Sequence, residues 1–576
     1  MKRFVLLSTV ALPLLLIAGL FAMYRPVAGS DGAPDLPDSA TADPFAIEIV
    51  RAYYPDESVL AEVRRWTEPW SWDREAGYIL LDVTGSERLW LEELGFRLEV
   101  DEALTARYSQ PNEYLPGQGN GIPGYACYRT VEETFTTIDD IVSNHPQLAS
   151  LIDIGDSWVK AEGGGPGYDM LVLKLTNSAI AGPKPILFSM SSVHAREYAP
   201  AELNTRFAEY LINNYGSDAD VTWLLDYHEI HLLLQANPDG RKMAESGILW
   251  RKNTNENYCS PTSTNRGADL NRNFPFQWDC CGGSSNSACS LTYHGPTPES
   301  EPEVQAITDY VSSIFADVRP DDFVTPAPIT TTGVFLDLHS FSQLVIWPWG
   351  HQTALPPNSQ EITTLGRKMA YFNNYLAAQA TVLGITDGTT DDFAYGTLGV
   401  AAYTIEMGTE FFQQCSVFEN TIVPANMPSL LYAAKSARAP YMLPAGPEAI
   451  DLSHQLLTIP VGTSATITFS ATLDDTRYSS GSEPTQNIAA AEFYIDTPPW
   501  ITATTPLPIA MTPADGNFDS SVEVVNGSLD ASGLALGRHS VFIRGQDAAG
   551  NWGIVAAFFV DVVETESLYL PLVTHP

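Results

Sequence analysis

The stretch ILFSMSSVHARE, residues 186–197, decides the fold class of this chain. Its first five residues form an apolar run of the length expected for a buried strand. Similar runs alternate with helical patterns from about residue 125 to residue 441. This alternation predicts an α/β domain, in which helices cover both faces of a sheet.

The apolar periodicity also predicts where the elements of this domain lie. The expected strands are residues 171–175, 186–190, 230–235, 334–338 and 401–405. The expected helices are residues 202–214, 300–315, 359–378 and 425–435.

A smaller unit precedes this domain, at residues 45–106. Its pattern predicts a small α+β unit, since strand-like and helical segments alternate over about 60 residues. The expected strands are residues 46–53, 77–83 and 96–100, and the expected helices are residues 58–66 and 86–94. Residues 107–124 are rich in Pro and Gly and predict a linker that a protease would find exposed.

The pattern changes again after Pro447. Short alternating strands, at residues 465–469, 491–495 and 539–545, are separated by Gly, Pro, Asp and Ser. They predict an immunoglobulin-like β-sandwich over residues 447–565, followed by a tail at residues 566–576.

The first 30 residues have the features of a secretory signal peptide. Lys2 and Arg3 precede an apolar run at residues 4–23, and small residues follow up to Ser30. We expect cleavage near Gly29 and a secreted protein, whereas a membrane anchor is the alternative. Residues 31–44 predict a disordered leader.

The charge of the chain excludes several kinds of partner. Its 30 basic and 69 acidic residues give a formal charge of −39. Nucleic acids and anionic membranes are bound through clustered Lys and Arg, so neither is an expected partner.

The six cysteines indicate an oxidising compartment. Cys259, Cys280, Cys281 and Cys289 lie close together, so a zinc cluster is an alternative to disulfides. Cys280 and Cys281 are adjacent, which is not the C-x-x-C spacing of zinc clusters, and we therefore expect disulfides.

Three residues at predicted strand ends have metal-binding chemistry. His194 and Glu197 follow the strand at residues 186–190, and His339 follows the strand at residues 334–338. Two imidazoles and one carboxylate suit a catalytic zinc with an open fourth position. His194 and Glu197 alone would more often form a simple hydrogen-bonded pair. Carboxyl ends of neighbouring strands are, however, where active sites of open α/β sheets lie.

A further acid and two basic residues complete the candidate site. Glu406 ends the strand at residues 401–405 and could act as a general base, or simply pair with a cation. Arg251 and Arg272 could bind a carboxylate and stabilise an oxyanion. The alternative for both arginines is a surface ion pair.

Ordered motifs give the chain a close resemblance to M14 zinc carboxypeptidases over residues 120–440. They are His194-Ala195-Arg196-Glu197, Asn237-Pro238-Asp239-Gly240, Trp250-Arg251-Lys252, Asp269-Leu270-Asn271-Arg272-Asn273, Tyr293-His294-Gly295-Pro296, Ser300-Glu301-Pro302-Glu303, Leu338-His339-Ser340 and Thr404-Ile405-Glu406. Several motifs in order are far more specific than any one alone. The resemblance implies a mixed eight-stranded sheet flanked by helices and a secreted metallocarboxypeptidase that acts on the C-termini of peptides.

The resemblance also implies a role for each site residue. His194, Glu197 and His339 would bind one zinc ion, and Glu406 would be the general base that activates the zinc-bound water. Arg251 would polarise the scissile carbonyl, and Asn271 and Arg272 would bind the terminal carboxylate, with Arg196 guiding it inward. Cys259 and Cys289 resemble a disulfide of the family, which leaves four cysteines for two further bridges.

Two positions concern the substrate. Gly384 stands where the family usually has a mobile Tyr that closes over the substrate. Because Gly has no side chain to do so, we expect weak substrate binding and a lower KM for Gly384→Tyr; Tyr371 or Tyr375 could substitute. Asp391 aligns with the base of the side-chain pocket and predicts a preference for C-terminal Lys or Arg. A solvated loop acid is the alternative.

The outer units have less specific resemblances. Residues 45–106 resemble the prosegments of secreted carboxypeptidases, which would shield the cleft until an activating protease cuts the linker; a permanent accessory domain is the alternative. The sandwich could contact a cell surface or a polysaccharide. The function predicted is therefore a secreted zinc carboxypeptidase made as a precursor. The alternatives are a cell-wall peptidase of the same fold and a catalytically weak binding protein.

Overall fold

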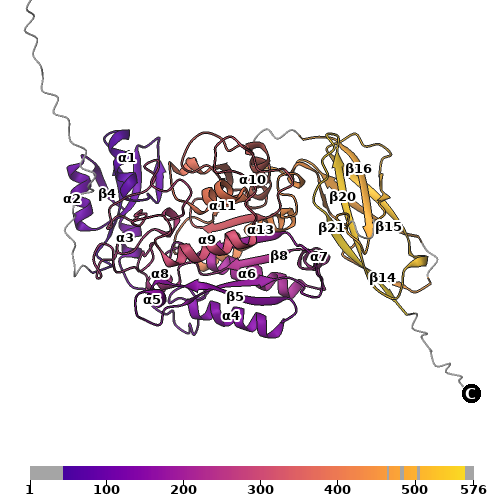
Figure 1. The fold of residues 1–576 in the computed structure, drawn as a ribbon, viewed down its shortest axis with the longest axis horizontal. Helices are drawn as coiled ribbons and strands as arrows, with labels where there is room; N and C mark the ends of the chain where they lie inside the picture. Colours follow the sequence, from indigo (N-terminus) through magenta and orange to yellow (C-terminus); the bar gives the residue numbers. More distant parts are fainter. Residues whose placement is uncertain (1–42, 463–465, 480–484, 502–505, 565–576) are drawn as a thin grey trace, which may run out of the picture.

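The computed structural model describes residues 43–462, 466–479, 485–501 and 506–564. Three units lie side by side along the long axis of the molecule, with the largest in the middle (Figure 1). The predicted signal peptide, nearly all of the predicted leader and the predicted tail lie outside the described residues. No helix within these ranges is both long enough and apolar enough to span a bilayer.

The central unit is built on a mixed eight-stranded sheet, as expected. Its strand order is β11-β10-β12-β9-β7-β8-β6-β5. The strands are β5 Ala149–Asp156, β6 Asp169–Leu175, β7 Ile186–Ser191, β8 Glu229–Leu233, β9 Val334–His339, β10 Leu344–Trp347, β11 Leu376–Gln379 and β12 Ala401–Glu406. The four middle strands, β12, β9, β7 and β8, are parallel to one another and deeply buried. This burial on both faces explains their nearly continuous apolar runs.

Helices flank this sheet. They are α4 Val131–Asn144, α5 Trp158–Ala161, α6 Tyr198–Asn214, α7 Ala219–Tyr227, α8 Pro238–Glu245, α9 Pro302–Ile314, α10 Ser359–Asn373, α11 Thr390–Leu398, α12 Cys415–Val417 and α13 Val423–Ser436. Local chemistry sets several of their ends. Thr130, for example, begins α4 with a capping box, in which Glu133 accepts from the Thr130 amide at 2.9 Å.

One predicted helix in the central unit was too long. The helix expected at residues 359–378 ends at Asn373, and Leu376–Gln379 forms the edge strand β11 beside β10. Asn374 lies between them with a left-handed backbone, at φ 56°. Asn tolerates this conformation and commonly ends helices, whereas the apolar pattern alone does not reveal the change to a strand.

The N-terminal unit has the α+β character that its pattern predicts. Its strands form a four-stranded sheet in the order β2-β3-β1-β4. The elements are β1 Glu48–Tyr53, α1 Glu57–Trp66, β2 Ser71–Asp73, β3 Tyr78–Val83, α2 Gly85–Glu93, β4 Arg97–Val100 and α3 Glu102–Tyr108. Strand β2 and helix α3 were not expected. Asp101 caps α3 by accepting a hydrogen bond from the Leu104 amide.

The C-terminal unit is a β-sandwich. One sheet has the order β13-β15-β19-β18 and the other the order β14-β21-β20-β16-β17. The strands are β13 Glu448–Ile450, β14 Leu456–Pro460, β15 Thr466–Asp474, β16 Ile488–Ile495, β17 Ile509–Ala510, β18 Thr512–Pro513, β19 Val522–Asp530, β20 Gly537–Asp547 and β21 Ala556–Val563. Phe469, Phe493 and Phe558 pack together in a core between the sheets.

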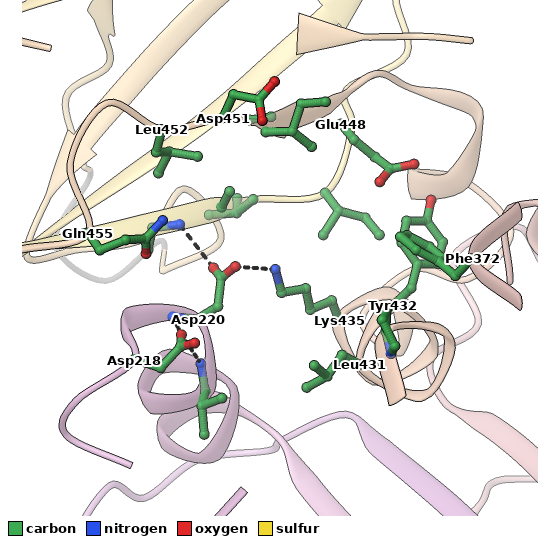
Figure 2. A pocket seen from close by; sticks show the side chains of 18 of the residues that line it. Asp218, Asp220, Phe372, Leu431, Tyr432, Lys435, Glu448, Asp451, Leu452 and Gln455 are labelled. Carbon is green, nitrogen blue, oxygen red and sulfur yellow. Dashed lines mark hydrogen bonds and ion pairs between the residues drawn. The ribbon is translucent and has the colours of Figure 1, made fainter. Parts of the chain in front are cut away.

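A cavity of about 470 Å³ lies where the sandwich meets the central unit. Figure 2 shows Asp220 of α7 there, paired with Lys435 of α13. Asp220 also accepts a hydrogen bond from the Ala557 amide of β21 at 2.9 Å. This seam lies at the opposite end of the central unit from the N-terminal unit (Figure 1).

Candidate metal and substrate site

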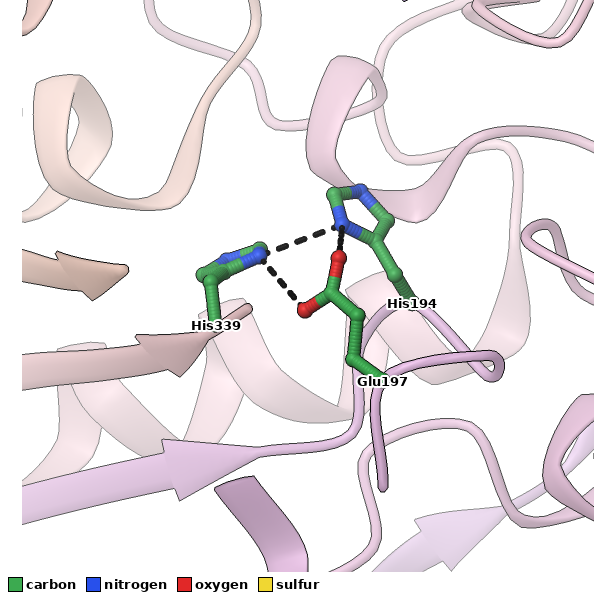
Figure 3. Close-up of side chains that lie close together, drawn as sticks. All are labelled: His194, Glu197 and His339. Atoms are coloured by element: carbon green, nitrogen blue, oxygen red, sulfur yellow. Dashed lines mark hydrogen bonds and ion pairs between the residues drawn. The ribbon is translucent and has the colours of Figure 1, made fainter. Parts of the chain in front are cut away.

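Three potential metal ligands converge at the carboxyl ends of two neighbouring strands. His194 and Glu197 follow β7, and His339 is the last residue of β9. The strands are parallel neighbours, so both end at the same edge of the sheet. The Nδ1 atoms of the two histidines are 3.1 Å apart, and each faces a carboxylate oxygen of Glu197, at 2.8 Å for His194 and 3.2 Å for His339 (Figure 3).

Other acids hold the opposite nitrogens of the two rings. His194 Nε2 lies 3.2 Å from an oxygen of Asp269, and His339 Nε2 lies 2.9 Å from an oxygen of Asp337. These contacts orient both rings so that the Nδ1 atoms face the shared centre. The Ser340 amide donates to Glu197 at 3.0 Å and orients its carboxylate.

The electrostatics of this centre favour a cation. Burial alone would raise the pKa of Glu197, but the facing imidazoles outweigh burial and hold that pKa well below its usual range. Two imidazole nitrogens and an ionised carboxylate, all buried within 4.8 Å of one another, are the ligand set of a catalytic zinc. The residues present therefore fit the predicted zinc ion.

Glu406 lies beside this centre. It ends β12 and is directly opposite His339 in the register of β12 and β9. Its carboxylate is buried and accepts no hydrogen bond from the residues that the structure describes. Burial raises the pKa of Glu406 to about 8. The nearby Glu197 carboxylate adds to this rise, whereas His339 opposes it. A raised pKa makes the ionised carboxylate a stronger base than an ordinary glutamate, which suits general-base chemistry.

The two candidate arginines lie in the same site. Asp269 anchors Arg251, whose Nε and Nη2 donate to one carboxylate oxygen at 3.1 and 2.8 Å. Arg272 donates to the carbonyl oxygens of Asn271 at 2.7 Å and of Gly283 at 3.2 Å. Asn271 accepts from the Thr390 amide at 2.9 Å, and its Nδ2 lies 3.4 Å from Nε2 of His339, so it is next to the candidate metal centre.

A carboxylate from the N-terminal unit, which the sequence did not single out, reaches both arginines. Glu68, just after α1, lies 2.5 Å from Arg251 Nη2 and 3.6 Å from Arg272 Nη2. Burial opposes ionisation of Glu68, but the two guanidinium groups outweigh it and lower its pKa to about 2. No local pattern marks this acid, because only packing of the two units brings it to Arg251.

Arg196 is also covered by the N-terminal unit. It is completely buried, with Nη1 3.8 Å from an Asp82 oxygen and its guanidinium 4.0 Å from the centre of the Phe411 ring. Asp82 also accepts from the indole of Trp70 at 2.8 Å. The structure therefore brings Arg196 to the seam between the two units, near the other site arginines.

Asp391 lies in the first turn of α11, where it is buried, and not in a solvated loop. One of its oxygens accepts from the Thr389 hydroxyl at 2.8 Å and from the Asp392 amide at 2.9 Å. Burial and the adjacent Asp392 carboxylate raise the pKa of Asp391 to about 7. The second oxygen has no hydrogen-bond donor among the described residues.

Gly384 has a backbone that changes the expectation for its replacement. Its φ is 106°, a conformation that side chains with a β-carbon rarely adopt, so Gly384→Tyr would be strained in this structure. The two tyrosines proposed as substitutes, Tyr371 and Tyr375, already have other partners. Tyr371 packs against Arg477, with the guanidinium 5.0 Å from the ring centre. The Tyr375 hydroxyl accepts from Asn426 at 3.0 Å and from the Gly408 amide at 3.3 Å.

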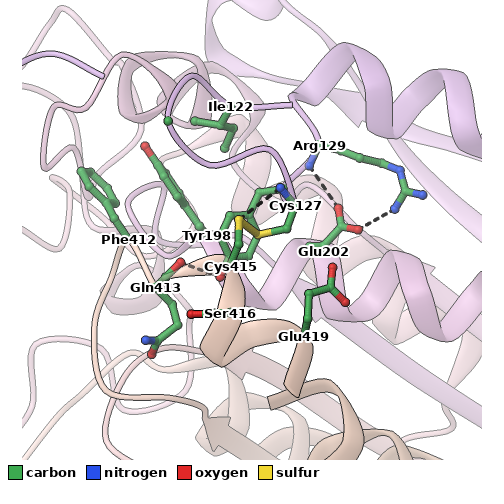
Figure 4. Close-up of a disulfide and its surroundings, with 12 residues drawn as sticks. Ile122, Cys127, Arg129, Tyr198, Glu202, Phe412, Gln413, Cys415, Ser416 and Glu419 are labelled. Carbon is green, nitrogen blue, oxygen red and sulfur yellow. Dashed lines mark hydrogen bonds and ion pairs between the residues drawn. A yellow bond between two sulfur atoms is a disulfide. The ribbon is translucent and has the colours of Figure 1, made fainter. Parts of the chain in front are cut away.

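All six cysteines form disulfides. Cys259–Cys289 matches the expected bridge, and the other pairs are Cys127–Cys415 and Cys280–Cys281. Figure 4 shows how Cys127–Cys415 joins segments 288 residues apart, beside the ion pair of Arg129 with Glu202 at 2.7 Å. The prediction of disulfides instead of a zinc cluster is confirmed.

Comparison with known proteins agrees with this site. The zinc carboxypeptidase family, Peptidase_M14, matches residues 135–426, slightly more than half of the chain. Carboxypeptidase A1 of Sus scrofa is 30% identical over 289 residues, which are 50% of this chain and 59% of that protein. A zinc carboxypeptidase of Saccharothrix mutabilis subsp. capreolus is 31% identical, over 49% of this chain and 62% of that protein. The chain thus spans less than two thirds of each relative.

Solved structures support the fold. A crystal structure of thrombin activatable fibrinolysis inhibitor aligns with a TM-score of 0.52 and 21% identity, over 68% of this chain and 98% of that one. Carboxypeptidase A from Helicoverpa armigera aligns with a TM-score of 0.53 and 20% identity, with the same two coverages. Together with the family match and the His194, Glu197 and His339 centre, these likenesses show that the chain belongs to the zinc carboxypeptidase family.

Proposed function

We propose that this protein is a secreted, zinc-dependent metallocarboxypeptidase, made as a precursor, that removes the C-terminal residue of peptides. One observation carries the proposal. The three zinc ligands, Glu406 and the Arg251–Arg272 pair all meet at one edge of the sheet. Hydrolysis of a terminal peptide bond needs each of these chemistries, a Lewis acid, a base and cations for the carboxylate and oxyanion.

Each group of the chain has a distinct part in the reaction. Bound zinc would polarise the attacking water and the scissile carbonyl. Glu406 accepts the proton of that water and then passes it to the leaving amine. Arg251 stabilises the negative charge that develops on the carbonyl oxygen. Arg272 and Asn271 bind the terminal carboxylate, which restricts cleavage to the last bond.

Asp391 would determine a preference for C-terminal Lys or Arg. The acid is buried, and one of its oxygens has no donor among the described residues. A cationic side chain would supply the missing partner and favour the ionised form of Asp391, since burial otherwise raises its pKa.

The N-terminal unit would keep the precursor inactive. Glu68 already lies against Arg251 and Arg272, the two residues proposed to bind the substrate. A substrate carboxylate would therefore have to displace Glu68. Residues 115–117 of the linker are exposed, so an activating protease could cut there and release the unit. Secretion is supported by the three disulfides, which persist in oxidising compartments.

The experiment uses the full chain before and after limited proteolysis in the linker. Two blocked dipeptides that differ only in a C-terminal Arg or Phe are assayed with and without a zinc chelator. Release by the cut chain that is sensitive to chelator and weak in the uncut chain is the expected result. A zinc-loaded, cut chain that releases neither residue would overturn the proposal, and Glu406→Gln supplies the inactive control.

A further inference from the structure

Gly384 lies under an arginine of the N-terminal unit. It follows the short helix Ala380–Leu383, and Arg64 of α1 crosses directly over it. Nη2 of Arg64 donates to the Leu383 carbonyl. A β-carbon on Gly384 would lie 2.5 Å from Cζ of Arg64 and still closer to Nη2. Arg64 and a side chain at position 384 therefore cannot occupy this place together.

Arg64 makes this contact without a paired acid. No carboxylate of the described residues lies within ion-pair distance of it, although acids outnumber bases in the chain by 69 to 30. Its guanidinium instead lies 4.7 Å from the centre of the Trp72 ring, which also contacts Arg74 at 4.0 Å. The Leu383 carbonyl is thus the main polar partner of a half-buried cation, and Gly384 is what makes that carbonyl reachable.

A second group of contacts, from residues 290–292, fixes the C-terminal end of α1. The last carbonyls of α1 need partners outside the helix, as at any helix end. The Arg65 carbonyl accepts from the Thr292 hydroxyl at 2.6 Å. The Trp66 carbonyl accepts from the Ser290 hydroxyl at 2.5 Å and from the Leu291 amide at 3.1 Å. The loop at residues 290–292 directly follows the Cys259–Cys289 disulfide.

The end of α1 is thus contacted from two sides of the catalytic unit. We call the residues that contact it, 290–292 together with Leu383 and Gly384, the socket. The last turn of α1 fits between them, and Glu68, four residues beyond Arg64, continues to Arg251. The socket therefore has the shape and chemistry for a helix C-terminus with an arginine in its last turn and an acid four residues later.

We propose that Gly384 sets how tightly the catalytic unit holds its own N-terminal unit, before and after the linker is cut. Because position 384 has no side chain, Arg64 can occupy the space above it. As a consequence, this position provides no side chain to close over the substrate. The occupant is the unit at residues 45–106, whose α1 is seated there. This inference deepens the proposed function and rests on the precursor role given to the N-terminal unit.

The test is a double-mutant cycle on the full chain, with one protease site inserted in the linker. After the cut, release of the N-terminal unit is followed by size-exclusion chromatography after dilution. Arg64→Ala and Gly384→Ala should each speed release by about 10-fold to 100-fold, the range for a hydrogen bond to a charged group. The double variant should release the unit no faster than either single variant, because both changes remove the same contact.

Matched controls separate this contact from other effects. Gly182→Ala places a β-carbon at a φ of 131° with no neighbour within 4 Å, so it reports strain alone and should not speed release. Arg74→Ala removes the other cation on Trp72, a contact within the N-terminal unit, and should change release less than about fivefold, the upper range for an exposed cation–π contact.

Two results would overturn the inference. One is an unchanged release rate in Arg64→Ala, and the other is a full effect of Gly384→Ala in the Arg64→Ala background. Zinc content and dipeptide hydrolysis are measured on the same samples. Absence of hydrolysis in every sample would contradict the proposed function, whereas the release rates alone decide the role of Gly384.

Discussion

The N-terminal unit meets the catalytic unit through charged groups of the active site, whereas the sandwich meets it through aromatic rings and buried ion pairs at the far end. Glu68 and Asp82 of the N-terminal unit reach Arg251 and Arg196. In the sandwich, Trp500 instead packs on Trp223 of α7, with ring centres 5.3 Å apart.

The ion pairs at the sandwich are of a different kind from those at the active site. Lys368 of α10 is completely buried and lies 3.1 Å from one oxygen of Glu448, while Arg477 lies 3.0 Å from the other. Separating the two units would be costly, because Lys368 would be left without its acid, whereas Glu448 and Arg477, both of the sandwich, would stay paired. The N-terminal contacts instead use cations that a substrate carboxylate could also satisfy.

Under the function proposed above, this difference predicts different fates for the two outer units. A unit whose acid is exchangeable with substrate, and which is joined by an exposed linker, suits removal. A unit held by buried partners suits permanent attachment. The variants below alter either the contacts of one outer unit or a residue of the proposed reaction, so that the two kinds of effect can be told apart.

The largest expected effect is on the chemistry itself. Glu406→Gln removes the proposed base and should lower kcat by about 10³-fold, within the range for general-base catalysis. Because no hydrogen bond or ion pair joins the Glu406 side chain to either outer unit among the described residues, the release rate of the N-terminal unit and the melting temperature should stay close to those of the parent. A loss of zinc in the variant, measured by atomic absorption, would instead indicate a structural role.

The second largest effect is expected at the contact between the sandwich and the central unit. Glu448→Ala leaves the buried Lys368 without its acid and should lower the free energy of unfolding by about 3 kcal/mol. Calorimetry of the linker-cut protein measures the loss, and hydrolysis per folded molecule should be unchanged. Asp515→Ala, at an exposed acid of the sandwich, is the matched control and should have little effect.

Docking of the N-terminal unit on the candidate site should depend on pH. Because the pKa of Glu68 is lowered to about 2 from an ordinary 4.5, its ion pairs stabilise docking fully above about pH 4.5. That contribution should disappear as the pH falls from 4.5 towards 2. Release of the cut N-terminal unit should therefore quicken over this range, and Glu68→Gln should release it quickly at every pH. A pH response retained in Glu68→Gln would contradict this assignment.

The smallest effect concerns selectivity of the form that has lost its N-terminal unit. Asp391→Asn should lower kcat/KM for a C-terminal Arg by about 10-fold to 100-fold, as for loss of a charged hydrogen bond, and leave a C-terminal Phe within about threefold. Because the pKa of Asp391 is raised to about 7, the preference of the parent for Arg over Phe should weaken as the pH falls through 7. An equal loss on both substrates would exclude Asp391 as the pocket acid.

Part of this protein could be determined from its sequence by itself. Buried parallel strands have continuous apolar runs, so β7, β9 and β12 were predicted nearly to the residue. The polar residues that follow them, His194, Glu197, His339 and Glu406, could be placed together because parallel strands end at one edge of a sheet. The zinc centre was therefore predictable from local patterns and one topological rule.

The tertiary structure alone decided the remaining features, since each is a pairing between segments distant in the chain. Glu68 on Arg251, Arg64 over Gly384 and the Cys127–Cys415 bridge all join separate segments. Periodicity tells which face of an element is buried, but it contains no information about which residue will meet that face. The sequence alone thus presented Gly384 as a missing side chain, whereas packing shows that Arg64 lies over the position.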